Sequence, residues 1–214
     1  MSTDTSGMPD AQENPGLATI YTEHPLDLDH DNNIRLIRVP PKTTSEDPAT
    51  HILVETQSVQ FRHAPPYTAL SYVWGPPENT KTILISGRPF SVRVNLWDFL
   101  DRVRQSDSLE YMWADALCID QSSNAERNHQ VALMGEIYSR ASKVVAWLGA
   151  GPPKLVHAFG ELSLMKPAEI TKQFDWNRAL IRRFGPVFRE ASYWRRAWIV
   201  QEYVLAENVE FWCG

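Results

Sequence analysis

Apolar and polar residues alternate, or gather into short apolar runs, through the first half of the chain, and this pattern predicts β-strands. Proline pairs and glycine residues separate the runs, as is typical of turns between strands. The predicted strands span residues 34–39, 51–61, 67–74, 81–86 and 89–94. Gly87 and Arg88, between the last two strands, are predicted to form a tight hairpin turn. Asn95 is a favourable N-cap, and the apolar residues at helical spacing after it predict a helix.

The second half of the chain alternates between strand-like and helix-like segments. Strands are expected at residues 111–117, 143–148 and 208–212, and helices at residues 125–141, 154–165, 176–188 and 193–206. Continuous apolar strands that alternate with helices are typical of a parallel sheet covered on both faces. We therefore predict an α/β fold, with a mostly parallel sheet flanked by helices and an extra β-rich N-terminal portion.

Residues 1–33 differ from the rest of the chain in composition and charge. They are rich in small polar residues, Gly and Pro, show no periodicity, and contain seven acidic residues but no Lys or Arg. The rest of the chain holds 21 basic and 19 acidic residues, so the net charge of −5 comes from this first segment. We expect most of residues 1–33 to be a disordered acidic leader, followed by one domain over residues 34–214.

Composition argues against several classes of protein. No apolar run reaches the roughly 18 residues of a membrane-spanning helix, and the N-terminus lacks the basic and apolar regions of a secretory signal. Two cysteines, Cys118 and Cys213, are too few for a disulfide framework, which favours a reducing, cytoplasmic location. Residues 34–214 are nearly neutral and so lack the basic footprint of a nucleic-acid-binding protein. The six histidines lack ligand spacing, so no metal site is expected.

Two segments imitate known ligand-binding loops. Residues 75–82 resemble a phosphate-binding loop, but Thr80 replaces its second glycine, two prolines remove N–H donors, and a strand follows instead of a helix. Residues 27–38 begin like a calcium loop, but Asn32 and Arg38 stand where Gly and Glu are required. We expect neither segment to bind the ligand that it imitates.

Three segments carry the strongest signal in the chain. They are Tyr67-Thr-Ala-Leu-Ser-Tyr-Val-Trp-Gly75, Trp113-Ala-Asp-Ala-Leu-Cys-Ile-Asp-Gln121 and Trp194-Arg-Arg-Ala-Trp-Ile-Val-Gln-Glu202. In this order, over residues 67–202, they resemble the fungal heterokaryon incompatibility (HET) domain. The resemblance implies a domain of fungal non-self recognition whose activation triggers programmed cell death.

HET domains look like distant relatives of TIR domains, and this resemblance implies a TIR- or flavodoxin-like sheet and a site. TIR domains that cleave NAD⁺ carry Trp-x-x-x-Glu on a helix, and Trp198-Ile-Val-Gln-Glu202 is similar to it, so Glu202 is the catalytic candidate. The β-rich segment over residues 75–94 has no counterpart in a minimal TIR domain, which leaves the shape of the cleft mouth open. By the same resemblance, the residues expected to contact NAD⁺ are Ser71, Tyr72, Trp74, Gly75, Asp115, Asp120 and Trp198.

Physical reasoning about Glu202 leaves two alternatives. Trp194, Trp198 and Glu202 are spaced by four residues, which puts them close to one face of a helix. A carboxylate among indoles loses solvation, so its pKa is expected to rise. Breaking the nicotinamide–ribose bond builds positive charge on the ribose, and a carboxylate placed there stabilises that charge. The alternative is a structural acid that pairs with Arg195 or Arg196.

Other polar residues near the second segment have the same two interpretations. Asp115 and Asp120 follow or end an apolar strand, where α/β folds place ligands, but Asp120 is also suited to ordering a turn before the next helix. Glu126 and Gln130 lie one helical turn apart and are expected to order that loop. Cys118 is expected to be a small core residue at a strand end and not a nucleophile.

Two functions follow from these observations. The domain either consumes NAD⁺ at a site around Glu202, with NAD⁺ as substrate and no resident cofactor, or it is a non-catalytic module that signals cell death by self-association through TIR-like surfaces. A third, weaker alternative is that it regulates a neighbouring activity in a longer chain. A non-self recognition protein is the partner that this role implies, and no membrane span or nucleic acid is expected.

Overall fold

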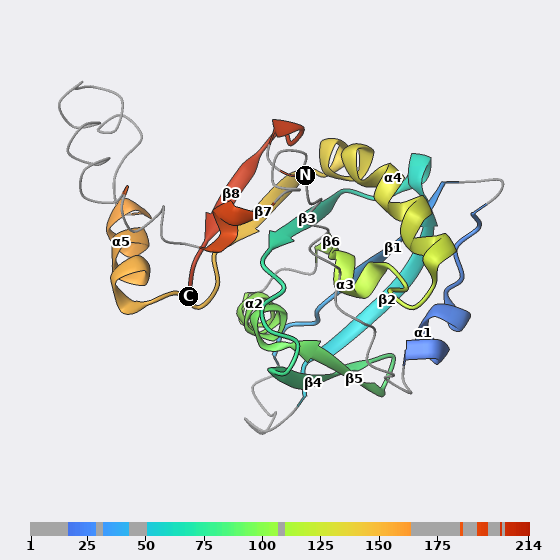
Figure 1. Ribbon diagram of the computed structural model, residues 1–214, viewed down its shortest axis with the longest axis horizontal. Helices are drawn as coiled ribbons and strands as arrows, with labels where there is room; N and C mark the ends of the chain where they lie inside the picture. Colours follow the sequence, from blue (N-terminus) through green and yellow to red (C-terminus); the bar gives the residue numbers. More distant parts are fainter. Residues whose placement is uncertain are drawn as a thin grey trace, which may run out of the picture.

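A sheet of eight strands runs through the part of the chain that the structure describes (Figure 1). The computed structural model describes residues 17–28, 32–42, 51–106, 110–163, 185, 192–196, 202 and 204–214. The strands are β1 (Asn33–Arg38), β2 (Leu53–Gln60), β3 (Tyr67–Tyr72), β4 (Thr80–Ile85), β5 (Arg88–Arg93), β6 (Tyr111–Trp113), β7 (Lys143–Trp147) and β8 (Val209–Trp212). Their order across the sheet is β5-β4-β2-β1-β6-β3-β7-β8.

Most neighbouring strands in this sheet are parallel. Four pairs, β2–β4, β3–β6, β3–β7 and β7–β8, run parallel. The antiparallel pairs are β1–β2, β1–β6 and β4–β5, so they lie in the half of the sheet that the N-terminal strands build. The predicted α/β class, with its mostly parallel sheet and extra β-rich N-terminal portion, is confirmed.

Helices pack against both sides of the central strands. They are α1 (Leu17–Glu23), α2 (Val94–Arg104), α3 (Asp115–Cys118), α4 (Asn124–Arg140) and α5 (Pro153–Ser163), with 3-10 turns η1 (Phe61–His63) and η2 (Ser192–Arg195). In Figure 1, α2 and α4 lie on opposite sides of β3. Phe99 of α2 packs on Trp147, with 5.8 Å between ring centroids, and Tyr138 of α4 packs edge-on against Trp113 at 5.7 Å. None of the described helices is long and apolar enough to cross a membrane.

Three expectations about individual elements are wrong. The strand expected at residues 111–117 ends at Trp113, because the N–H groups of Leu117 and Cys118 both bond the Ala114 carbonyl and close the helical turn α3. Cys118 is therefore a buried residue of a helix and not of a strand end, although it does belong to the core. Asn95 is not an N-cap, since α2 begins at Val94.

The expectation of a disordered leader does not hold for residues 17–23. These residues form α1, whose Ile20 and Tyr21 are buried. The Arg35 guanidinium lies over the Tyr21 ring at 4.7 Å, and the Tyr21 hydroxyl points to the Leu117 carbonyl at 3.4 Å. Two apolar side chains are too short a pattern to predict a helix, but they are enough to dock a helix of about two turns on an existing core. Residues 1–16 lie outside the described residues.

The helix expected at residues 193–206 begins differently from the prediction. Ser192–Arg195 forms the 3-10 turn η2, Arg196 is not helical, and Glu202 and Val204 are helical. The helix expected at residues 176–188 falls almost wholly outside the described residues, as does Trp198.

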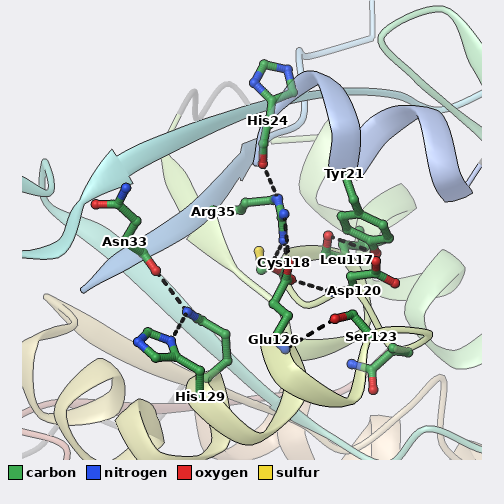
Figure 2. A network of polar contacts seen from close by, with 12 residues as sticks. Tyr21, His24, Asn33, Arg35, Leu117, Cys118, Asp120, Ser123, Glu126 and His129 are labelled. Atoms are coloured by element: carbon green, nitrogen blue, oxygen red, sulfur yellow. Dashed lines mark hydrogen bonds and ion pairs between the residues drawn. The ribbon is translucent and has the colours of Figure 1, made fainter. Parts of the chain in front are cut away.

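A buried ion pair joins the N-terminal elements to the segment around α3 (Figure 2). Arg35 on β1 is 0% exposed, and its guanidinium forms a two-point contact with the Glu126 carboxylate on α4, one of the two bonds being 3.0 Å. Arg35 also donates to the carbonyls of His24 and Cys118, at 2.7 and 3.1 Å. The Asp120 N–H donates to Glu126 at 2.6 Å. One ion pair thereby fixes α1, β1, α4 and the end of α3.

We predict that Glu126→Gln lowers the free energy of unfolding by about 3–5 kcal/mol, because it leaves the Arg35 charge buried without a counter-charge. Urea unfolding measures the change. The matched control is Glu55→Gln, which breaks the exposed ion pair between Arg38 and Glu55 and should cost no more than about 1 kcal/mol. Equal, small effects of both substitutions would contradict the structural role of the buried pair.

Candidate functional site

A small cavity lies where β3 and β6 end at their carboxyl sides. Its volume is about 50 Å³, which holds a few water molecules and is well below the roughly 300–1,000 Å³ of a typical ligand pocket. The described residues that line it are Trp74, Asp115, Ile119, Gln121, Arg127, Val131, Met134, Arg196 and Glu202. The carboxyl ends of parallel strands are where α/β folds bind ligands. The cavity brings together Trp74, Asp115 and Glu202 from all three sequence segments.

Glu202 lies at the centre of a buried polar cluster on one side of the cavity. Its side chain is 0% exposed, and Arg196 binds both of its carboxylate oxygens, each at 2.6 Å. The Ser71 hydroxyl, near the end of β3, also donates to Glu202 and accepts a 2.6 Å hydrogen bond from the Tyr193 hydroxyl. Arg196 donates to Ser71 as well, at 3.1 Å. The ion pair between Glu202 and Arg196, which the sequence analysis gave as an alternative, is therefore present. It lies beside the cavity.

Asp115 lies on another side of the cavity, as the first residue of α3. Its two oxygens accept hydrogen bonds from the Trp74 indole N–H and the Ala116 backbone N–H, both at 2.8 Å. Burial raises the pKa of this carboxyl from 3.8 to about 6, against the opposing effect of the Trp74 hydrogen bond. Burial likewise raises the pKa of Tyr72, which faces Asp115, well above its ordinary value. Asp115 therefore titrates close to neutral pH.

The loop that carries Trp74 is held by residues around the start of α2. The Asn95 amide donates to the Val73 carbonyl, and its oxygen accepts from the Trp147 indole N–H at 2.9 Å. The Arg93 guanidinium donates to the Gly75 carbonyl and lies over the Trp74 ring at 5.1 Å. Gly75 has φ +79°, a left-handed conformation that favours glycine. The β-rich segment over residues 75–94 thus ends beside the residues that fix one wall of the cavity.

Asp120 does not line the cavity. Its carboxylate accepts from the Ser122 N–H at 2.9 Å and the Ser122 hydroxyl at 2.6 Å, while its own N–H donates to Glu126. These contacts support the interpretation that Asp120 orders the turn, and Figure 2 shows Asp120 beside Glu126. Glu126 orders this loop, as expected, by accepting from the Asp120 N–H, whereas Gln130 donates to the Asn33 carbonyl on β1 at 2.8 Å and not to the loop.

The remaining described residues that the sequence analysis singled out do not line the cavity. Ser71 and Tyr72 are buried behind the cavity wall, and Gly75 belongs to the Trp74 loop. Trp194 does not share a face with Glu202, since it is 38% exposed in η2 and packs on Phe211 at 5.8 Å. Burial raises the pKa of Cys118 to about 12, so this thiol is protonated at neutral pH. Among the described residues, no group of three or more His, Cys, Asp or Glu side chains is placed to hold a metal ion.

Sequence reasoning missed the partners that set this geometry. No sequence pattern indicates Arg93 as a partner in the site, and the spacing around Asn95 favours an N-cap and not the contacts that it makes. Only Tyr193 had a signal, namely its position one residue before the third sequence segment.

Comparisons with known proteins connect the chain to fungal incompatibility proteins. A family model described as "Heterokaryon incompatibility protein (HET)" matches residues 67–202. Heterokaryon incompatibility protein 6, OR allele, of Neurospora crassa is 29% identical over 197 residues, covering 70% of this chain and 29% of that protein. Vegetative incompatibility protein HET-E-1 of Podospora anserina is 27% identical over 159 residues, covering 73% of this chain and 10% of that protein. The chain thus spans less than a third of either relative. No solved structure matches it.

The raised pKa of Asp115 predicts an unusual dependence of stability on pH. Between about pH 4 and pH 6 the folded protein binds more protons at this carboxyl than the unfolded chain does, so Asp115 makes the free energy of unfolding fall as the pH rises through that window. Asp115→Asn removes this contribution. Urea unfolding at pH 4, 5, 6 and 7 should therefore show the variant gaining stability relative to wild type as the pH rises.

Asp98→Asn is the control for that series, because Asp98 is a partly exposed carboxylate paired with Lys81. A difference between wild type and Asp115→Asn that stays constant from pH 4 to pH 7 would show that Asp115 has an ordinary pKa.

Proposed function

Because the chain belongs to the heterokaryon incompatibility (HET) family, we propose that it acts in fungal non-self recognition and triggers cell death by cleaving NAD⁺ at the nicotinamide–ribose bond. The proposed reaction takes place in the cytoplasm at the cavity between Trp74, Asp115 and Glu202. NAD⁺ is its substrate, and the reaction requires no resident cofactor.

One observation carries the proposal: two carboxylates from segments 87 positions apart, Asp115 and Glu202, line one cavity at the carboxyl ends of parallel strands. Burying charge is costly, and ion pairs placed in the interior seldom add net stability. Perturbed or buried ionisable groups that gather beside a cavity are typical of functional sites. The resemblance of Trp198-Ile-Val-Gln-Glu202 to the TIR motif is a separate reason to place the proposed reaction near Glu202.

The chemistry of the cavity suits this bond. Leaving of the nicotinamide builds oxocarbenium-like positive charge on the ribose, which nearby carboxylates stabilise in a site shielded from water. Trp74 supplies an aromatic face for the nicotinamide ring. Arg127, which also lines the cavity, supplies positive charge for the phosphates. Because the cavity is smaller than a dinucleotide, we propose that the nicotinamide–ribose bond lies at its mouth and that the rest of NAD⁺ lies outside.

The incompatibility role rests on the relatives. Both curated relatives are named for incompatibility reactions in fungi, and consumption of NAD⁺ is a direct way to turn recognition into cell death. The rest of each relative lies outside the region that this chain matches, so the trigger that activates the domain is not part of the proposal.

The first test is nicotinamide release by the purified protein at high concentration, wild type beside Glu202→Gln. The substitution keeps the side chain's size but removes the charge that holds Arg196 and Ser71. We expect it to lower turnover by about 100-fold, as misplaced active-site groups do. Glu207→Gln, which changes an exposed acid, is the matched control and should keep the wild-type rate. Circular dichroism confirms that each variant folds.

Absence of turnover by the wild type, even when it is crowded or forcibly oligomerised, would overturn the enzymatic proposal. A non-catalytic module that signals by self-association would then replace it, and cell death in a fungal host would be insensitive to Glu202→Gln.

A further inference from the structure

Resting on the proposed function, we infer that Asp115, and not Glu202, is the carboxylate that acts on the substrate, and that Glu202 is a positioning residue that works through Arg196 and Ser71. This assignment reverses the one that the TIR resemblance implies. It follows from what each carboxylate contacts and from how far each is exposed.

Glu202 lines the cavity, but its carboxylate is already engaged by protein donors. Both of its oxygens bind Arg196, and one also accepts from Ser71, so the guanidinium compensates its charge and these donors occupy three of its roughly four lone-pair positions. The side chain is 0% exposed. A carboxylate whose charge is matched by a two-point partner stabilises a third, positive group only weakly. Glu202 instead fixes Arg196, which reaches the cavity, against the end of β3.

Asp115 has the opposite environment. Its two hydrogen-bond donors, the Trp74 indole and the Ala116 amide, are neutral, and no Lys or Arg among the described residues forms an ion pair with it. Asp115 is half-buried as a residue and lines the cavity. When Asp115 is ionised, its negative charge therefore faces the cavity without an ion-pair partner among the described residues. The bond to Trp74 also ties the carboxylate to the aromatic face beside which the nicotinamide is proposed to lie.

The groups around Asp115 suit it to accept a proton. Burial is the largest influence and raises its pKa to about 6; the Trp74 hydrogen bond and the Arg196 charge lower it, and the Glu202 charge raises it. Asp115 is therefore mostly ionised at pH 7 and close to the value that favours a general base. The titratable and charged groups that face it are Tyr72 from β3, Cys118 from α3, Tyr138 and Arg127 from α4, and Arg196 and Glu202.

The proposed step balances without any further reactant. The bond between ribose C1′ and the nicotinamide nitrogen breaks, and its electron pair leaves with neutral nicotinamide. Positive charge develops on C1′ and the ring oxygen, beside the Asp115 carboxylate. A water oxygen adds to C1′ and its proton passes to Asp115, which later releases it to solvent. The products are nicotinamide, ADP-ribose and one proton.

The two carboxylates can be separated by the pH dependence of kcat/KM. The wild type should lose activity as the pH falls through about 6, because protonated Asp115 cannot accept a proton. Asp115→Asn should lower kcat/KM by about 10²–10⁴-fold and abolish this acid limb. Glu202→Gln should keep the limb but move it to lower pH, because the negative charge that raises the Asp115 pKa is gone while Arg196 remains.

The experiment measures nicotinamide release from NAD⁺ between pH 4.5 and pH 8 by the full chain, its Asp115→Asn, Asp115→Glu and Glu202→Gln variants, and the control Asp98→Asn. Asp115→Glu keeps a carboxylate, so it should retain the acid limb at a lower rate, and it tests the assignment even if Asp115→Asn fails to fold. Asp98→Asn should match wild type throughout.

The possible results discriminate between the two levels of the proposal. An inactive wild type overturns the proposed function and this inference together. A wild type that is active, with Asp115→Asn retaining both the rate and the acid limb, overturns the inference alone and returns the chemistry to Glu202. An acid limb that disappears in Glu202→Gln but persists in Asp115→Asn would likewise overturn the inference and leave the proposed function standing.

Discussion

The buried ion pair between Arg35 and Glu126 is the interaction on which the arrangement around the cavity depends. It joins β1 to α4, and through the Cys118 carbonyl and the Asp120 amide it also holds the segment between them. That segment supplies Asp115, Ile119 and Gln121 to the cavity. Neither Arg35 nor Glu126 lines the cavity, but their ion pair holds the segment that does.

A second buried charge pair acts on the opposite side of the cavity. Glu202 and Arg196 are tied to the end of β3 through Ser71, and Tyr193 completes the cluster from η2. Such pairs contribute little net stability but are costly to break, so they fix one geometry against alternatives. With the Trp74 loop held from the start of α2, three separate sets of contacts converge on a cavity of about 50 Å³. This convergence is the physical basis for treating the cavity as a site.

The sequence predicts those parts of the structure that depend on local pattern. The periodicity of residues 125–141 and the apolar run at 143–148 correspond to α4 and β7, and the three motif segments do meet at the strand ends. What it could not predict depends on distant contacts. Arg35 and Glu126 lie 91 positions apart, and α3 forms because the Ala114 carbonyl accepts two N–H groups where the apolar pattern alone favours a strand. The roles of Glu202 and Asp115 likewise follow from their partners and not from their spacing.

The central claim, that NAD⁺ binds beside Asp115, can be tested without turnover through the indole N–H signal of Trp74. A protein labelled with ¹⁵N at tryptophan is titrated with a non-cleavable carbocyclic analogue of NAD⁺, and the Trp74 signal is identified by its loss in Trp74→Phe. Because this N–H donates to Asp115 at the cavity wall, binding at the proposed position should shift it saturably, while the buried indoles of Trp113 and Trp147 stay nearly unchanged. A folded protein whose Trp74 signal does not move at saturating analogue would contradict the account.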